Sequence, residues 1–131
     1  MAKYFLDANI ILDLIDSDRG NLVTTKEFIR EVILKGDELC TSCDIFTTVY
    51  YVASKKLSSQ NIISELEKLL TFIDVIAIDM DTIKEAMNLM KDDYDFEDLL
   101  QYVCALRSSS DVIITNDKAF YRGEIAIRSL K

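Results

Sequence analysis

Two short apolar segments of this chain are each followed by an acidic residue. Asp7 comes directly after the apolar residues 4–6, and Asp117 comes shortly after the apolar residues 112–114. An acid at the end of a buried strand is energetically costly unless a charge or a metal ion compensates it. In open parallel sheets, ligands bind at the carboxyl ends of the strands. Asp7 and Asp117 therefore predict a polar site at one edge of a sheet.

A third group of acids lies at the start of a predicted helix and consists of Asp95, Glu97 and Asp98. Asp95 and Asp98 are three residues apart, so both can face the same side of the first helical turn. Each acid also has a simpler explanation: a favourable helix dipole for Asp95 and Glu97, a helix N-cap for Asp7, and a turn for Asp117. Three unrelated caps and turns are a less economical explanation, so we favour one shared site.

The chemistry of such a site follows from its donor atoms. Clustered carboxylates raise one another's pKa values unless a cation lies among them. The chain has no His, which excludes His ligands and His general bases. Oxygen ligands alone favour Mg²⁺ or Mn²⁺, and such an ion can polarise a phosphoryl oxygen and generate hydroxide from bound water. The net charge of −8 disfavours nucleic-acid binding through charge alone but is compatible with acids concentrated in a metal site.

Strand-like and helix-like segments alternate along the 131 residues, which we take as one domain, 1–131. Strands are predicted at 4–6, 38–41, 75–78, 112–114 and 125–127. Helices are predicted at 8–16, at 22–35 with Gly36 closing the helix, from 42 or 44 to about 56, from 58 or 59 to 70, from 79 or 81 to 90, and from about 95 onward. This alternation predicts an α/β fold with a mostly parallel sheet of four to five strands in a three-layer α/β/α sandwich.

The predicted location is the cytoplasm. No apolar run is long enough for a transmembrane helix, the N-terminal residues lack the pattern of a signal peptide, and three cysteines do not make a disulfide framework. Cys40 and Cys43 form a C-x-x-C motif at a predicted helix N-terminus, where a thiol pKa would be lowered. A redox site or half a zinc site lacks further partners in the sequence, and the alternative is a pair of small buried residues.

Four segments together resemble PIN-domain proteins of the VapC toxin type, in the subgroup with an Asp-Phe-Glu-Asp motif. They are residues 5–13 (FLDANIILD), 46–51 (FTTVYY), 95–102 (DFEDLLQY) and 113–120 (IITNDKAF). Their order and spacing extend over nearly the whole chain, which makes the combination more specific than any single segment.

The resemblance implies a Mg²⁺- or Mn²⁺-dependent endoribonuclease that hydrolyses phosphodiester bonds of single-stranded RNA. It also implies a toxin held inactive by a small antitoxin protein, and a homodimer. Matched residue by residue, the metal-binding and catalytic acids are Asp7, Asp98 and Asp117. The supporting polar positions are Asn9, Thr48, Thr115 and Asn116, and Thr115 is expected to hold a carboxylate or a water molecule.

The chain departs from the family pattern at Thr48, where most members have a Glu. Either Asp95 or Glu97 substitutes for it, or the site holds one ion where others hold two. The missing acid also leaves open a catalytically inactive PIN-like module that binds RNA or protein. A receiver-like or phosphatase domain with Asp7 as nucleophile is a third interpretation, but it predicts an Asp in place of Asn9 or a lone phosphorylatable Asp on a later strand.

Several residues are candidates for contacts with RNA. Lys118 and Arg122 are preferred because they follow Asp117 directly, over the other basic candidates Lys55, Lys56, Lys91 and Arg107. Three tyrosines could stack on bases, although their helical spacing favours packing in the core or in a dimer: Tyr50, Tyr51 and Tyr102.

Overall fold

The computed structural model describes residues 1–131 and is built around one sheet of five parallel strands. The order across the sheet is β3-β2-β1-β4-β5, so the first strand of the chain is the central one. The strands are β1 (Lys3–Leu6), β2 (Glu38–Ser42), β3 (Asp74–Ile76), β4 (Val112–Ile114) and β5 (Ala126–Arg128). The predicted α/β fold with five strands is confirmed, and the sheet is parallel throughout.

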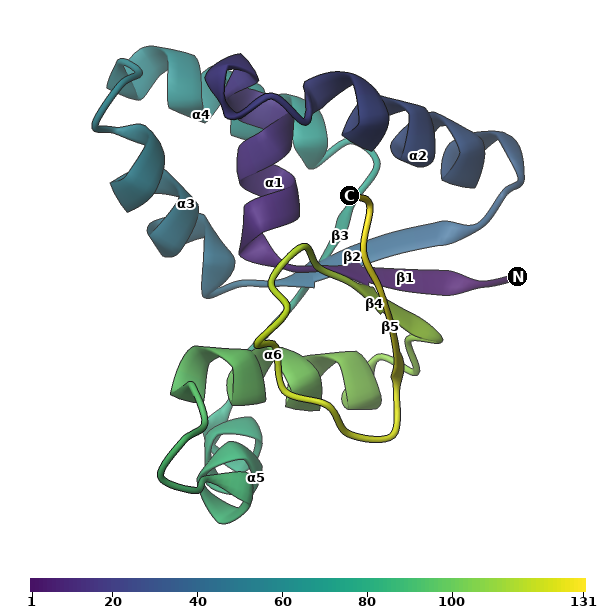
Figure 1. Ribbon diagram of the computed structural model, residues 1–131, viewed down its shortest axis with the longest axis vertical. Coiled ribbons are helices and arrows are strands. Elements are labelled where there is room, and N and C mark those ends of the chain that lie inside the picture. Colours follow the sequence, from purple (N-terminus) through teal and green to yellow (C-terminus); the bar gives the residue numbers. More distant parts are fainter.

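Six α-helices cover the two faces of this sheet (Figure 1). One face carries α1 (Ala8–Ile15), α2 (Leu22–Leu34), α3 (Ile45–Ala53) and α4 (Ser59–Leu69), and the other carries α5 (Met80–Leu89) and α6 (Phe96–Arg107). A short 3₁₀ helix, Ser17–Arg19, follows α1. The three layers match the predicted sandwich.

Capping residues explain where several helices begin and end. The side chains of Asp7, Ser58 and Asp79 accept hydrogen bonds from backbone N–H groups in the first turns of α1, α4 and α5, which satisfies donors that have no partner within the helix. Gly36 lies just beyond α2 with a φ of +74°, and its N–H donates to the carbonyl of Ile33. Glycine adopts this left-handed conformation without the strain that a side chain would cause.

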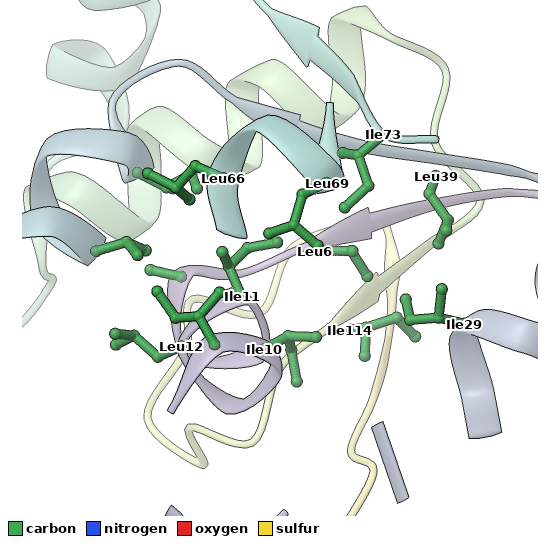
Figure 2. Packing of buried hydrophobic residues seen from close by; sticks show 14 of the residues in the cluster. Leu6, Ile10, Ile11, Leu12, Ile29, Leu39, Leu66, Leu69, Ile73 and Ile114 are labelled. Carbon is green, nitrogen blue, oxygen red and sulfur yellow. The ribbon is translucent and has the colours of Figure 1, made fainter. Parts of the chain in front are cut away.

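The two faces of the sheet have separate hydrophobic cores because alternate residues of a strand point to opposite sides. Leu6 and Ile114 belong to a cluster of 18 buried residues beneath α1 to α4 (Figure 2). Phe5 and Ile113 belong to a cluster of seven on the other face. The central strands β1 and β4 are therefore apolar on both sides, and the polar residues next to them lie at the strand ends.

The structure differs from the sequence prediction mainly at the end of one helix. We predicted that the third helix continues to about residue 56, but α3 ends at Ala53 and residues 54–56 form a turn. The exposed residues there carry no apolar face that would extend the helix. No helix in the structure is both long enough and apolar enough to span a membrane.

Candidate active site

Asp7 lies where the central strand passes into α1 and is almost fully buried, with 5% of its surface exposed. Its Oδ1 accepts a hydrogen bond from the Ala8 N–H at 2.6 Å. Its Oδ2 accepts from the Thr115 hydroxyl at 2.7 Å and from Asn9 Nδ2 at 2.9 Å. Burial raises the pKa of Asp7, and the Asp117 charge adds to this rise, whereas the hydrogen bonds from Thr115 and Ala8 lower it.

Thr115 connects this carboxylate to the neighbouring strand. It follows β4, and its side-chain oxygen accepts hydrogen bonds from the Asp117 N–H at 3.0 Å and from Asn9 Nδ2 at 3.2 Å while its proton goes to Asp7. The Asn9 carbonyl oxygen in turn accepts from the Asn116 N–H at 3.1 Å. The network holds the ends of β1 and β4 in a fixed relation. It agrees with the expectation that Thr115 holds a carboxylate.

Asn116 is anchored on its other side by an acid that the sequence analysis did not assign. Asn116 Nδ2 donates to Asp13 Oδ2 at 3.3 Å, and Arg19 Nε donates to Asp13 Oδ1 at 2.7 Å. Asp13 is 1% exposed, so this ion pair compensates its burial. The only signal in the sequence was a charge among the apolar residues of a helix.

Asp117 and Asp98 approach Asp7 from two further elements. Asp117 is exposed and accepts a hydrogen bond from the Ala119 N–H at 2.9 Å. Asp98 is half-buried in the first turn of α6. Burial raises the pKa of Asp98 to about 7, and the negative charges of Asp7, Asp95, Asp117 and Glu97 contribute to this rise. The three acids predicted from the sequence therefore interact electrostatically in the folded chain.

The two remaining acids of the Asp-Phe-Glu-Asp motif differ in their contacts. Asp95 is the N-cap of α6, and its Oδ1 accepts from the Asp98 N–H at 3.1 Å. Glu97 instead faces α3, where the Thr48 hydroxyl donates to its Oε2 at 2.8 Å. Burial raises the pKa of Glu97, and the charges of Asp44, Asp95 and Asp7 act in the same direction. Of the two candidate substitutes for an acid at position 48, Glu97 is the one in contact with Thr48.

The donor set suits a hard cation, although the side chains do not form a closed cage. All the acidic groups are carboxylates, and their charges raise one another's pKa values, an unfavourable crowding that a divalent cation would offset. No three Cys, Asp or Glu side chains are arranged as a metal-binding cluster in the structure. The oxygens of Asp7 accept three hydrogen bonds from neutral donors, which leaves the carboxylate a lone-pair site for a cation.

A groove with three basic residues lies beside Asp117. It has a volume of about 480 Å³ and is lined by Thr115, Asn116, Asp117, Lys118, Arg122, Ile127, Ser129 and Lys131. Lys118 and Arg122, the two basic residues preferred from the sequence, are therefore next to an acid of the site, and Lys131 joins them from the C-terminal end. Lys131 was not predicted because it is far from Asp117 in the sequence.

Three other residues that were candidates for RNA contacts interact with residues of the protein itself. Arg107 pairs with Asp79 at 3.3 Å and with Glu85 at 3.2 Å, so its charge is already compensated. Tyr102 is buried, and its hydroxyl accepts from the Glu124 N–H at 2.8 Å, which leaves no face for a base. Tyr51 is exposed, but Lys55 lies over its ring, 5.1 Å from the centroid.

The structure gives no support to a redox site at the C-x-x-C motif. Cys40 and Cys43 are both free thiols. Burial raises the pKa of Cys40, against the lowering by a helix N-terminus that a redox cysteine would need. The alternative prediction, a pair of small buried residues, was wrong for Cys43, which is exposed.

The site roles of two polar residues near the acids, one buried and one half-buried, were not predicted from the sequence. Gln101 is completely buried on α6, and its Oε1 has no hydrogen-bond partner. Asp44, predicted only as a helix cap, makes no side-chain capping bond and instead accepts from the Ser42 hydroxyl. A polar residue at an apolar position of a helical repeat was the available signal for Gln101.

Comparison with known proteins agrees with this geometry. A model of the PIN domain family matches residues 4–125. The chain is 34% identical over 128 residues to ribonuclease VapC1 of Aquifex aeolicus, covering 95% of this chain and 88% of the relative.

Solved structures share the fold at low sequence identity. The DNA-bound VapBC structure from Salmonella typhimurium has a TM-score of 0.74 at 18% identity and covers 100% of both chains. VapC20 of Mycobacterium tuberculosis, a toxin that cleaves the sarcin–ricin loop, has a TM-score of 0.73 at 15% identity, covering 89% of this chain and 92% of its own. With the family match and the relative of known activity, these findings show that the chain belongs to the PIN domain family, as a ribonuclease of the VapC type.

Proposed function

We propose that this ribonuclease is a Mg²⁺- or Mn²⁺-dependent endonuclease for single-stranded RNA and that Asp7, Asp98 and Asp117 are its metal-binding and catalytic acids. The observation that carries the proposal is the convergence of these acids from β1, α6 and the end of β4. The Thr115 hydroxyl donates to Asp7 and accepts from the Asp117 N–H, and the charges of Asp7 and Asp117 contribute to the raised pKa of Asp98. Bound among them, the divalent ion would supply a hydroxide nucleophile from water and stabilise charge on the phosphoryl oxygens.

The protein's own residues prepare the site for that chemistry. Thr115 and Asn9 fix the orientation of Asp7 through its Oδ2. Hydrogen bonds from neutral donors favour the ionised form of a buried carboxylate, which is the form that binds a cation. The N–H of Ala119 holds Asp117 by its Oδ1, so one of its oxygens remains for another partner. Asp95 orders the first turn of α6, on which Asp98 lies.

The groove beside Asp117 is the proposed path of the RNA backbone. Lys118, Arg122 and Lys131 provide three positive charges within one groove, in a protein whose net charge is −8. Phosphate contacts of this kind supply affinity without sequence recognition.

The partners that we propose are inferred from the relationship to VapC toxins. Solved relatives of this fold include a toxin–antitoxin complex from Klebsiella pneumoniae. We infer that this chain is the toxin of such a pair, inhibited by an antitoxin protein, that it acts in the cytoplasm as a single domain, and that it forms a homodimer.

The direct test is cleavage of a mixed RNA pool by the purified protein with Mn²⁺, with Mg²⁺ and with a chelator, beside Asp7→Asn. Metal-dependent cuts that are absent from the variant would support the nuclease and reveal its sequence preference. RNA binding without cleavage under any ion would favour the alternative of an inactive binding module, for which Thr48 in place of an acid is the structural argument.

A further inference from the structure

Gln101 is a polar residue on the buried, apolar face of α6. Its exposed fraction is 0%, as it is for Leu99 and Val103 on the same helix. Its Nε2 lies 3.4 Å from Glu97 Oε1, and its side chain also interacts with Asp7, lowering the pKa of that acid. Burial of an amide costs free energy unless its polar atoms are satisfied, yet the Oε1 of Gln101 has no partner. The amide therefore faces two carboxylates and retains an unused acceptor.

Glu97 is held at both oxygens of its carboxylate. Gln101 approaches Oε1, and the Thr48 hydroxyl of α3 donates to Oε2 at 2.8 Å. A Glu in the first turn of a helix needs no such contacts, because the helix dipole already favours it in water. Two side-chain donors from two helices instead keep this carboxylate half-buried between α3 and α6.

No Lys or Arg forms an ion pair with Glu97 in the structure. The donors that hold it, Thr48 and Gln101, are neutral. A buried Oδ2 of Asp44 also lacks a partner. Negative charges that crowd together with unsatisfied acceptors indicate a site for a positive ligand.

We propose that Glu97 is the fourth carboxylate of the cation site and that Thr48 and Gln101 are positioning residues that hold it there. This inference rests on the proposed function and deepens it. The acid missing at position 48 of α3 is then supplied from α6, at the place where Thr48 contacts it. The Oε1 of Gln101 remains a buried acceptor without a partner beside this carboxylate.

The test is Mn²⁺ binding measured by titration calorimetry, which does not depend on cleavage. We expect Glu97→Gln to weaken Mn²⁺ binding at least about tenfold, and Thr48→Val and Gln101→Leu to weaken it by about ten- to a hundredfold, the range typical of residues that orient metal ligands. Glu67→Gln, an exposed acid on α4, is the control and should bind as the original protein does. Unfolding midpoints measured in chelator identify any variant that is misfolded. Thr48→Val tests the Thr48–Glu97 contact without changing the buried Gln101.

Exchanging the carboxylate and the hydrogen-bond donor between positions 48 and 97 distinguishes the effect of positioning Glu97 from the effect of losing its negative charge. The double variant Thr48→Glu with Glu97→Gln moves the carboxylate to α3 and the hydrogen-bond donor to α6. Recovery of Mn²⁺ affinity to within about threefold of the original protein is expected, since a hydrogen-bonded carboxylate is again present between the helices.

The results of the Mn²⁺ titrations distinguish a failure of the role proposed for Glu97 from a failure of the proposed function. Mn²⁺ affinity unchanged in Glu97→Gln but lost in Asp98→Asn would overturn the role of Glu97 and leave the three-acid site standing. Absence of Mn²⁺ binding in the original protein would overturn both.

Discussion

The Thr115 hydroxyl donates to Asp7 Oδ2 at 2.7 Å, between residues 108 positions apart in the sequence. The bond lies where β4 and β1 end side by side, three residue pairs after their register begins at Tyr4 and Val112. A hydroxyl has one proton, and this one goes to the most buried of the three proposed ligands. The paired strands thus fix an acid of the site as well as the sheet.

Thr115→Val should therefore destabilise the protein. It leaves Asp7 buried with one donor fewer and also removes the acceptor for the Asp117 N–H. We expect the free energy of unfolding to fall by about 1–3 kcal/mol, measured by urea denaturation. Thr115→Ser keeps the hydroxyl and should recover most of the loss. An equal loss in both variants would assign the effect to the methyl group instead.

Asp7→Asn, Asp98→Asn and Asp117→Asn should each reduce RNA cleavage at least about a hundredfold, the scale on which removal of one transition-state-stabilising group acts. The amide keeps the size of each side chain but loses the charge that binds a cation. Circular dichroism and thermal unfolding should show a folded protein. Asp92→Asn, in the exposed connection between α5 and α6, is the matched control; full activity in Asp98→Asn would refute its assignment.

Stability measured in chelator should depend on pH through Asp98. Its pKa is raised from 3.8 to about 7, so the folded state holds this proton more tightly than the unfolded state does. The contribution of Asp98 to stability is therefore fully present below about pH 4 and is lost as the pH rises through 7. Unfolding midpoints of the original protein and Asp98→Asn at pH 5, 6, 7 and 8 check this. The difference between the two proteins should change with pH; a constant difference would contradict the shift.

The basic groove should account for much of the salt dependence of RNA binding. In an Asp7→Asn background, which prevents cleavage, the combined change of Lys118, Arg122 and Lys131 to Gln removes three charges from the groove. The slope of log affinity against log salt should become shallower by about 2, from roughly 0.7 per phosphate contact on single strands. Lys84→Gln, exposed on α5, should leave the slope unchanged. An unchanged slope in the triple variant would place the RNA elsewhere.

The order and type of the elements could be predicted because local patterns determine them. Runs such as residues 112–114 are too short and too apolar for anything but a buried strand, and Asp79 and Ser58 cap the helices they precede. The end of α3 was missed because residues 54–56 carry no breaker such as Gly or Pro. Its termination depends on how the chain turns toward α4, which is a tertiary effect.

The proposed site was predictable only as far as its members follow strands or begin helices. Asp7 and Asp117 follow the neighbouring strands β1 and β4, and Asp98 lies in the first turn of α6. Gln101 and Asp13 lie inside helices, where a polar residue is ordinarily on the solvent side. Each also has a partner on a distant element, Asn116 for Asp13 and Asp7 for Gln101, so no local pattern predicts their burial.

The central position of β1 also has a consequence for protein synthesis. A chain leaves the ribosome from its N-terminus, so Asp7 emerges before β4 and the acid that follows it. The central strand β1 cannot pair with its second neighbour, β4, until β4 has been made. Contacts between segments so distant along the chain also form slowly. The nascent polypeptide consequently has no complete set of the proposed catalytic acids until β4 and Asp117 have been made, and a ribonuclease assembled in this order cannot cut RNA before that point of its own synthesis.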